Sequence, residues 1–170
     1  MTSKKNSIQH TSDNELTHSM AHYLLTIHKL KENKGYARVT DIANDMGLTK
    51  GSVSTALNNL KKRDLVVEDD SKFLSLSNDG HEQVHSILSA RTLLYYFLKD
   101  ILKVDDDTAH QDSCLMEHLV SEETREKFFL FMKKVGARPG KMNLKTDLEL
   151  EKFESPDEFY RAQKGDKYLE

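Results

Sequence analysis

Apolar residues recur at helical spacing near the beginning of the chain and predict a first amphipathic helix. Positions three and four apart lie on one side of a helix, so this spacing produces a single apolar stripe. Asp13 or Asn14 can cap the start of the helix, and Gly35 can end it because glycine adopts positive φ at little cost. The apolar stripe consists of Leu16, Met20, Tyr23, Leu24, Ile27 and Leu30.

Two further helices, separated by a tight turn, are predicted next. The first spans residues 39–46 and stops at Gly47, and the second runs from residue 50 to about residue 63. A short helix, a glycine turn and a longer helix that starts with small polar residues are typical of a helix-turn-helix. The inner faces of the two helices are formed by Ile42, Ala43 and Met46, and by Val53, Ala56, Leu57 and Leu60.

The outer face of this helix pair is suited to contact DNA. No Asp or Glu occurs between residues 46 and 63, although the chain has 28 acidic residues and a net charge of −3. Small side chains at a helix start can enter a major groove, and the N–H groups and dipole there favour phosphate. We expect DNA contacts from Arg38, Thr49, Lys50, Ser52, Ser54, Thr55, Lys61, Lys62 and Arg63.

Two short β-prone segments follow and predict a hairpin, the wing. Residues 65–68 and 73–76 are rich in Val and Leu and are separated by a polar turn. Ser77 or Asn78 can cap a long helix that continues to about residue 102. The alternative for the whole N-terminal half is a helix pair in a bundle that has no role in nucleic-acid binding.

The apolar surface of the long helix is wider than one stripe. Leu93, Tyr96 and Phe97 lie beyond the main stripe, so the helix needs a second packing partner. A second copy of the chain is the simplest partner and predicts a homodimer; the alternative is a monomer whose C-terminal tail covers the surface. The main stripe consists of Val84, Ile87, Leu88, Leu94, Tyr95, Leu98 and Ile101.

The segment from residue 108 to 118 carries candidate metal ligands. If it is helical, four side chains lie on one face at positions i, i+4, i+7 and i+8, namely His110, Cys114, Glu117 and His118. Leu115 and Leu119 point in another direction and can be buried. Imidazole, thiolate and carboxylate together suit a borderline divalent transition metal. The alternatives are a cysteine that fills the core and histidines that are solvated.

Composition and charge narrow the class of protein. Eight Lys or Arg and three acids lie between residues 28 and 63, whereas eight acids and two bases lie between residues 102 and 126. This asymmetry is consistent with a basic segment that binds a polyanion and an acidic segment that binds cations. We expect neither a membrane span nor a signal peptide, because no apolar run is long enough. The single cysteine is typical of the reducing cytoplasm.

These patterns predict a mainly α-helical protein. A length of 170 residues suffices for one domain or two small ones. The expected parts are a polar arm at residues 1–13, a winged helix-turn-helix at 14–77, a helical dimerisation and metal-binding domain at 78–135, and a partly helical tail at 136–170 that packs on the body.

Four segments resemble the DtxR/MntR family of metal-dependent repressors (diphtheria toxin repressor and manganese transport regulator). The most specific is Cys-x-x-Glu-His-x-x-Ser at residues 114–121, because generic winged-helix regulators lack it. The others are residues 35–43, the helix that starts at Thr49 and the strand at 65–67. The resemblance covers roughly residues 16–135 and implies a dimeric, cytoplasmic repressor of metal-ion homeostasis that binds palindromic double-stranded DNA.

The resemblance also implies a primary metal site. Position by position, its ligands are Cys114, Glu117 and His118 from one helix, and His22 from the first helix, where relatives have Met or Asp. Such a site ties the N-terminal helix to the dimer core. Fe²⁺ and Mn²⁺ are the implied metals, with Zn²⁺ also possible, because relatives with Cys at this position tend to respond to iron.

The second, ancillary metal site of the family is incomplete in this chain. Relatives have a His and a Glu on the long helix where this chain has Arg91 and Tyr95, and His110 matches the remaining ligand. A guanidinium cannot ligate a metal. We therefore expect one metal per chain, with the Arg91 charge in place of a second cation. The chain also has Asp64 where relatives usually have Gly before the wing.

Two other functions are compatible with the residues. A winged-helix regulator could sense an organic ligand or the redox state through Cys114, and its DNA binding would be indifferent to a chelator. A small zinc hydrolase could use Glu117 as its base, although Glu117 beside His118 is better placed as a ligand.

Overall fold

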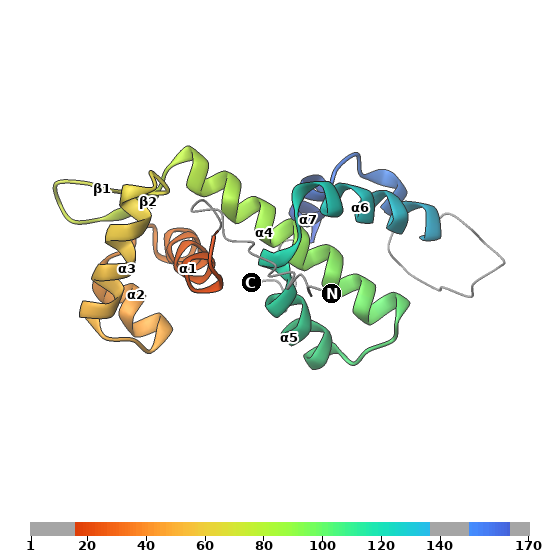
Figure 1. Ribbon diagram of the computed structural model, residues 1–170, viewed down its shortest axis with the longest axis horizontal. Helices are drawn as coiled ribbons and strands as arrows, with labels where there is room; N and C mark the ends of the chain where they lie inside the picture. The colour runs from red at the N-terminus through yellow and green to blue at the C-terminus, as the bar shows by residue number, and fades with distance from the viewer. Residues whose placement is uncertain (1–15, 137–149, 164–170) are drawn as a thin grey trace, which may run out of the picture.

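A computed structural model of the protein describes residues 16–136 and 150–163, and this part of the chain has two lobes (Figure 1). The N-terminal lobe contains three helices and a two-stranded hairpin. A long helix leads from the hairpin into a helical C-terminal lobe. The predicted arm at residues 1–13 lies outside the described residues, as do residues 137–149 and 164–170 of the predicted tail.

The helices of the N-terminal lobe lie where the apolar spacing predicts them. Gly35 and Gly47 end the first two, with left-handed φ angles of 78° and 66°. Their buried side chains form one core with the wing and the first turns of the long helix. The three helices are α1 (His18–Lys34), α2 (Val39–Met46) and α3 (Lys50–Lys62).

The start of α1 differs from the prediction. The side chain of Thr17 caps the helix and accepts a hydrogen bond from the backbone N–H of Met20 at 3.3 Å. This bond satisfies one of the N–H groups that a helix start leaves without a partner. Asp13 and Asn14, the predicted caps, lie outside the described residues and before this turn.

The wing is an antiparallel hairpin of β1 (Val66–Glu68) and β2 (Leu74–Leu76), as predicted. The N–H of Leu74 donates to the carbonyl of Ala37 at 2.8 Å, which joins the wing to the segment before α2. Asp64, just before the wing, has a φ of 55°. This left-handed conformation suits the glycine that the family resemblance implies at this position, and Asp tolerates it better than most residues.

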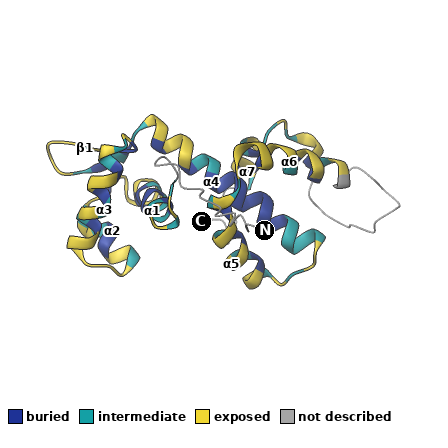
Figure 2. Ribbon diagram, viewed as in Figure 1, coloured by how far each residue is buried: buried dark blue, intermediate teal, exposed yellow. Residues whose placement is uncertain are grey.

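The long helix α4 (Asn78–Tyr96) is shared by the two lobes and continues into one π-helical segment, η1 (Phe97–Ile101). Its start is capped by Ser77, whose hydroxyl accepts from the N–H of Gly80 at 3.0 Å. The helix contacts α1 and β2 in one lobe and α5, α6 and α7 in the other. Its central part is buried on nearly every side (Figure 2).

The C-terminal lobe packs the remaining helices around the second half of α4. The predicted helix of ligand-type residues ends earlier than expected, and its last part is a 3-10 turn. The elements are α5 (Asp106–Met116), η2 (Glu117–Leu119), α6 (Glu122–Gly136), η3 (Leu150–Lys152) and α7 (Pro156–Ala162). Of the helices that the structure describes, none combines the length and the apolar character needed to cross a bilayer.

The chain itself buries part of the wide apolar surface of α4. Leu93 and Tyr96 are buried within one chain, and Tyr96 packs on Phe159 of α7 with ring centroids 5.6 Å apart. The tail thus covers this part of the surface through α7, while the homodimer stays a prediction. The described part of the tail contains the helix α7, whose Phe159 lies in the core of the C-terminal lobe.

Leu115 and Leu119, whose side chains we expected could be buried, do not enter the core of the single chain. They are 59% and 76% exposed in the single chain. The reason is the direction in which α5 faces: Ala109 and Ser113, one turn apart, are buried against the rest of the lobe, so the opposite side of the helix faces outward. With Met116, also exposed, the two leucines form an outward apolar patch, called here the 115–119 patch.

Gly80 permits the close approach of α4 to the wing. A Cβ at this position would lie 2.1 Å from the carbonyl oxygen of Leu65, a backbone atom that cannot move aside as a flexible side chain does. We expect Gly80→Ala to lower the free energy of unfolding by about 3 kcal/mol, measured by urea denaturation. Gly51→Ala is the control, because nothing lies closer than 4.0 Å there. Equal stability of the two variants would contradict the close approach.

Candidate metal centre and DNA-contacting surface

The start of α3 is open to solvent, as a DNA-contacting helix requires. Thr49, Lys50 and Ser52 are exposed, whereas Ser54 is half-buried. Oγ1 of Thr49 accepts from the N–H of Ser52 at 3.2 Å and lies 2.9 Å from its hydroxyl. These hydroxyls therefore stabilise the helix start, and the exposed ammonium of Lys50 remains available to a phosphate.

Three of the five cations among the predicted DNA-contacting residues are engaged within the lobe. Their partners belong to the wing or to α1: Lys61 pairs with Glu68, Arg63 donates to the sulfur of Met20 at 3.0 Å, and the guanidinium of Arg38 lies 4.2 Å from the ring centroid of Phe73. Lys62 is exposed. The geometry thus supports Lys50 and Lys62 as phosphate contacts more strongly than the other predicted cations.

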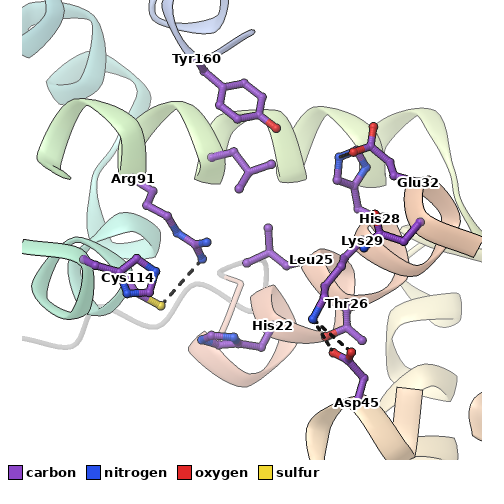
Figure 3. Close-up of a pocket in the computed structure, with 13 residues that line it drawn as sticks. His22, Leu25, Thr26, His28, Lys29, Glu32, Asp45, Arg91, Cys114 and Tyr160 are labelled. Carbon is purple, nitrogen blue, oxygen red and sulfur yellow. Dashed lines mark hydrogen bonds and ion pairs between the residues drawn. The ribbon is translucent and has the colours of Figure 1, made fainter. Parts of the chain in front are cut away.

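Several predicted metal ligands surround a cavity where the two lobes meet. The cavity has a volume of about 550 Å³ and is lined by residues of α1, α2, α4, α5 and α7 (Figure 3). His22 of α1 reaches it from one lobe, and His110 and Cys114 of α5 reach it from the other. Arg91 of α4 projects between them. The fold therefore brings together the two segments that the resemblance selected, which are far apart in the sequence.

A buried ion pair, Arg91 with Glu117, stands at the centre of this region. Nη2 of Arg91 donates to Oε1 of Glu117 at 2.9 Å and Nε donates to Oε2, and the side chains are 8% and 1% exposed. Burial raises the pKa of Glu117, and the guanidinium opposes that rise. Burial also disfavours the charged form of Arg91. The attraction of Glu117 outweighs this effect of burial, so the pKa of Arg91 is raised. Glu117, a predicted metal ligand, thus binds a guanidinium.

Arg91 also contacts the single cysteine. Nη2 of Arg91 lies 3.8 Å from Sγ of Cys114. Burial raises the pKa of the Cys114 thiol, and Arg91 offsets this only in part. Reactive thiols have a lowered pKa, so this environment argues against Cys114 as a redox sensor. Tyr95, at the other altered ancillary position, is buried and its hydroxyl accepts from Lys99 at 3.0 Å.

His22 and His118 meet a third histidine that the sequence analysis missed. His18 is the first residue of α1, and its Nε2 lies 3.0 Å from Nε2 of His22. Its ring centroid lies 4.5 Å from that of His118. The spacing of His18 and His22, four residues apart in a predicted helix, is the signal that could have found it, because such pairs share a face.

Burial and a neighbouring histidine disfavour the charged form of two imidazoles in the cluster. Burial, followed by the effect of His18, lowers the pKa of both His22 and His118. Nδ1 of His18 and Nδ1 of His118 are buried without a hydrogen-bond partner. A neutral imidazole with an unpartnered nitrogen is the form that ligates a metal.

The described residues fit a divalent metal in part. The imidazoles supply suitable donors, whereas Arg91 contacts both Glu117 and Cys114. Within residues 16–136 and 150–163, no three His, Cys, Asp or Glu side chains are close enough to hold a metal ion as they stand. The predicted ligands therefore remain a prediction; they are His22, Cys114, Glu117 and His118 from the resemblance, together with His110.

A winged helix-turn-helix lobe joined to a helical lobe defines a DNA-binding regulator, and comparisons with known proteins specify the family. Residues 15–72 match the DNA-binding domain of the iron-dependent repressors, and residues 77–142 match their metal-binding and dimerisation domain. The MntR transcriptional regulator of Shouchella clausii is 36% identical over 105 residues, which cover 62% of this chain and 73% of the relative. The chain belongs to the iron-dependent repressor (DtxR/MntR) family of metal-dependent transcriptional regulators, which are not enzymes.

Solved structures agree with this fold. The manganese regulator SloR is 26% identical, with a TM-score of 0.59, and the match covers 67% of this chain and 53% of SloR. ScaR with bound Zn²⁺ has a TM-score of 0.60 at 22% identity, with the same two coverages. The chain thus spans about half the length of these two structures, and the likeness to ScaR concerns the fold alone.

The Arg91–Glu117 pair generates a prediction about stability. Arg91→Met leaves a buried carboxylate without its partner and should lower the free energy of unfolding by about 3–5 kcal/mol. The double variant Arg91→Met/Glu117→Met removes both charges and should recover most of the loss, since an apolar pair of similar size can replace a buried ion pair. Urea unfolding in the presence of a chelator measures both. Additive losses in the double variant would show that the pair is not coupled.

Proposed function

We propose that this chain represses genes of metal-ion homeostasis and binds its operator more tightly when a divalent transition metal is held where α1 meets η2. The observation that carries the proposal is the contact between histidines of the two lobes, since His18 and His22 belong to α1 and His118 to η2. The metal would supply a shared Lewis acid at this contact. His22 and His118 are the ligands on which the resemblance and the geometry agree.

The position of the histidines explains how the site reaches the DNA. α1 packs on α2, α3 and the wing, so it is part of the DNA-contacting lobe, whereas η2 packs on α4 in the other lobe. A metal bound by ligands from both lobes would favour one relative arrangement of the lobes over an ensemble of several arrangements. In a dimer, one arrangement fixes the spacing of two recognition helices, which two adjacent half-sites of a palindromic operator require.

The identity of the metal follows from donor chemistry and from the relatives. Imidazole and thiolate donors disfavour Mg²⁺ and Ca²⁺ and leave Fe²⁺, Mn²⁺ and Zn²⁺. The family is described as iron-dependent, one solved relative is named a manganese regulator, and another holds Zn²⁺. We infer Fe²⁺ or Mn²⁺ as the physiological effector, with Zn²⁺ as a competing ligand, in a protein that acts beside the chromosome in the cytoplasm.

We further infer that Arg91 supplies a permanent positive charge where relatives have an ancillary metal ligand. Its guanidinium binds Glu117 and contacts Cys114, so it holds η2 against α4 without any ion. One metal per chain then suffices for the response. Lys50 and Lys62, both exposed on α3, are expected to contact operator phosphates.

The function predicts a metal-dependent gel shift. A duplex selected from a random library in the presence of Mn²⁺ should bind the wild-type chain at least about tenfold more tightly with Mn²⁺, Fe²⁺ or Zn²⁺ than with a chelator, a coupling of typical size. His22→Ala should remove this difference because α1 loses a ligand. His81→Ala, on the exposed side of α4, is the matched control. Equal affinity with metal and with chelator would defeat the proposal and favour a regulator that senses something else.

The 115–119 patch predicts the dimer surface. Leu119 is 76% exposed, an unusual position for a leucine beside two other apolar side chains, and the matched family domain mediates dimerisation. Leu119→Glu should shift the chain from dimer to monomer in sedimentation equilibrium and leave its unfolding curve at low concentration unchanged. Val67→Glu, on the exposed wing, should stay dimeric. A dimeric Leu119→Glu variant would place the interface elsewhere.

A further inference from the structure

A second cavity lies between α4, α6 and α7, away from the candidate metal centre and the DNA-contacting surface. Its volume is about 520 Å³, and the three helices that form it contact one another. α7 lies beyond residue 142, where the match to the family domains ends. The cavity is therefore built in part from residues that the family pattern does not assign.

Arg125 of α6 lies at the inner end of this cavity. The residue is 8% exposed and lines the cavity, whereas Glu82, Glu122 and Arg161, which line it too, are exposed. Within the described part of the chain, Nε and Nη1 of Arg125 are buried and have no hydrogen-bond acceptor. A buried donor without an acceptor is unfavourable, and such groups are few in native proteins. This guanidinium thus lacks the oxygen acceptors that its burial requires.

Neighbouring carboxylates balance the charge of Arg125 but do not accept its hydrogen bonds. Nη1 lies 4.0 Å from Oδ1 of Asp157, and Nη2 lies 4.0 Å from Oε1 of Glu126, which is beyond hydrogen-bond distance. Oδ1 of Asp157 accepts from the hydroxyl of Ser89 instead. The guanidinium therefore needs acceptor oxygens more than it needs a further negative charge.

The rest of the lining carries charges of both signs. Arg161 adds a second guanidinium, Glu82 and Glu122 add carboxylates, and Ser86 adds a hydroxyl, together with two histidines and a glutamine. A simple anion would meet the guanidinium groups but also the carboxylates, and a simple cation would meet the same conflict in reverse. A molecule with a carboxylate at one end and an ammonium group at the other can form charge-assisted hydrogen bonds with both kinds of group.

We propose that this cavity binds a small zwitterion, a free α-amino acid, whose carboxylate accepts from Arg125 and whose ammonium group donates to the exposed carboxylates. Such a ligand supplies the missing acceptors without changing the net charge of the site. Glu82 and Ser86 belong to the half of α4 that follows the wing, so the ligand would join α6 and α7 to that half. The inference is independent of the proposed function, because none of the expected metal ligands lines this cavity.

Thermal unfolding of the full chain in the presence of a chelator tests the site. Each standard amino acid is added in turn at millimolar concentration, and one that binds only the folded chain raises the Tm by mass action. We expect at least one to raise the Tm, and isothermal titration calorimetry of that amino acid to show a single site per chain. Acetate, inorganic phosphate and methylammonium, which each carry charge of one sign, should show no saturable binding.

Variants of the two arginines locate the ligand. Arg125→Met should weaken binding of that amino acid by about tenfold or more, because hydrogen bonds to a charged group are lost. Its far-ultraviolet circular dichroism should match the wild type, since the guanidinium has no hydrogen-bond acceptor to leave behind. Arg161→Gln, on the exposed side of the cavity, should weaken binding by a smaller factor and serves as the test if Arg125→Met does not fold. Lys127→Met, exposed on α6 and outside the lining, should bind normally.

Three outcomes would overturn the inference. An unchanged Tm with every amino acid would leave water as the partner of Arg125. Binding of acetate or phosphate as tight as that of the amino acid would make the site one for a simple anion. Equal affinity of the wild type and both arginine variants would place the ligand elsewhere. Metal-dependent DNA binding is measured separately by the gel shift and does not change with any of these results.

Discussion

The structure depends most on the buried pair between Arg91 and Glu117. An isolated charge at either position would be costly, so each requires the other, and together they fix the 3-10 turn η2 against α4. This turn places His118 beside His18 and therefore brings the histidines of the two lobes together. We propose that the same guanidinium supplies the charge of an ancillary cation and that a metal acts at the junction of α1 and η2.

α4 transmits the state of that junction because both lobes pack on it. Near its start, the absence of a side chain at Gly80 lets the helix lie against the carbonyl of Leu65, so the wing cannot move independently of α4. Near its end, the apolar surface is filled by α6 and α7 of the same chain. We propose that the exposed 115–119 patch on α5 and η2 receives a second copy, in which case dimerisation and the core of the lobe use different surfaces.

Local patterns in the sequence predicted most of the fold, and long-range packing accounts for what they missed. Helical periodicity located α1 to α4, and the hairpin followed from two β-prone runs, because these features arise within a few residues. Which sides of α5 and η2 are buried depends on contacts with other elements, so the exposure of Leu115 and Leu119 in the single chain could not be predicted. The pairing of Lys61 with Glu68 across the wing, and of Arg91 with Glu117, could not be derived from spacing. In the candidate site, the resemblance selected His22 and His118, but His18 was overlooked because relatives offer no ligand there to guide the choice.

The central claim is that the histidine junction couples metal binding to DNA binding. Linkage requires the coupling to be reciprocal: operator DNA must raise the metal affinity by the same factor by which the metal raises the DNA affinity. The direct measurement is the dissociation constant of Mn²⁺ for the dimer, determined by competition with a fluorescent chelator, with and without saturating operator duplex. The account predicts tighter Mn²⁺ binding in the presence of the duplex, by a factor equal to the metal effect in the gel shift. The same metal affinity with and without DNA would contradict it.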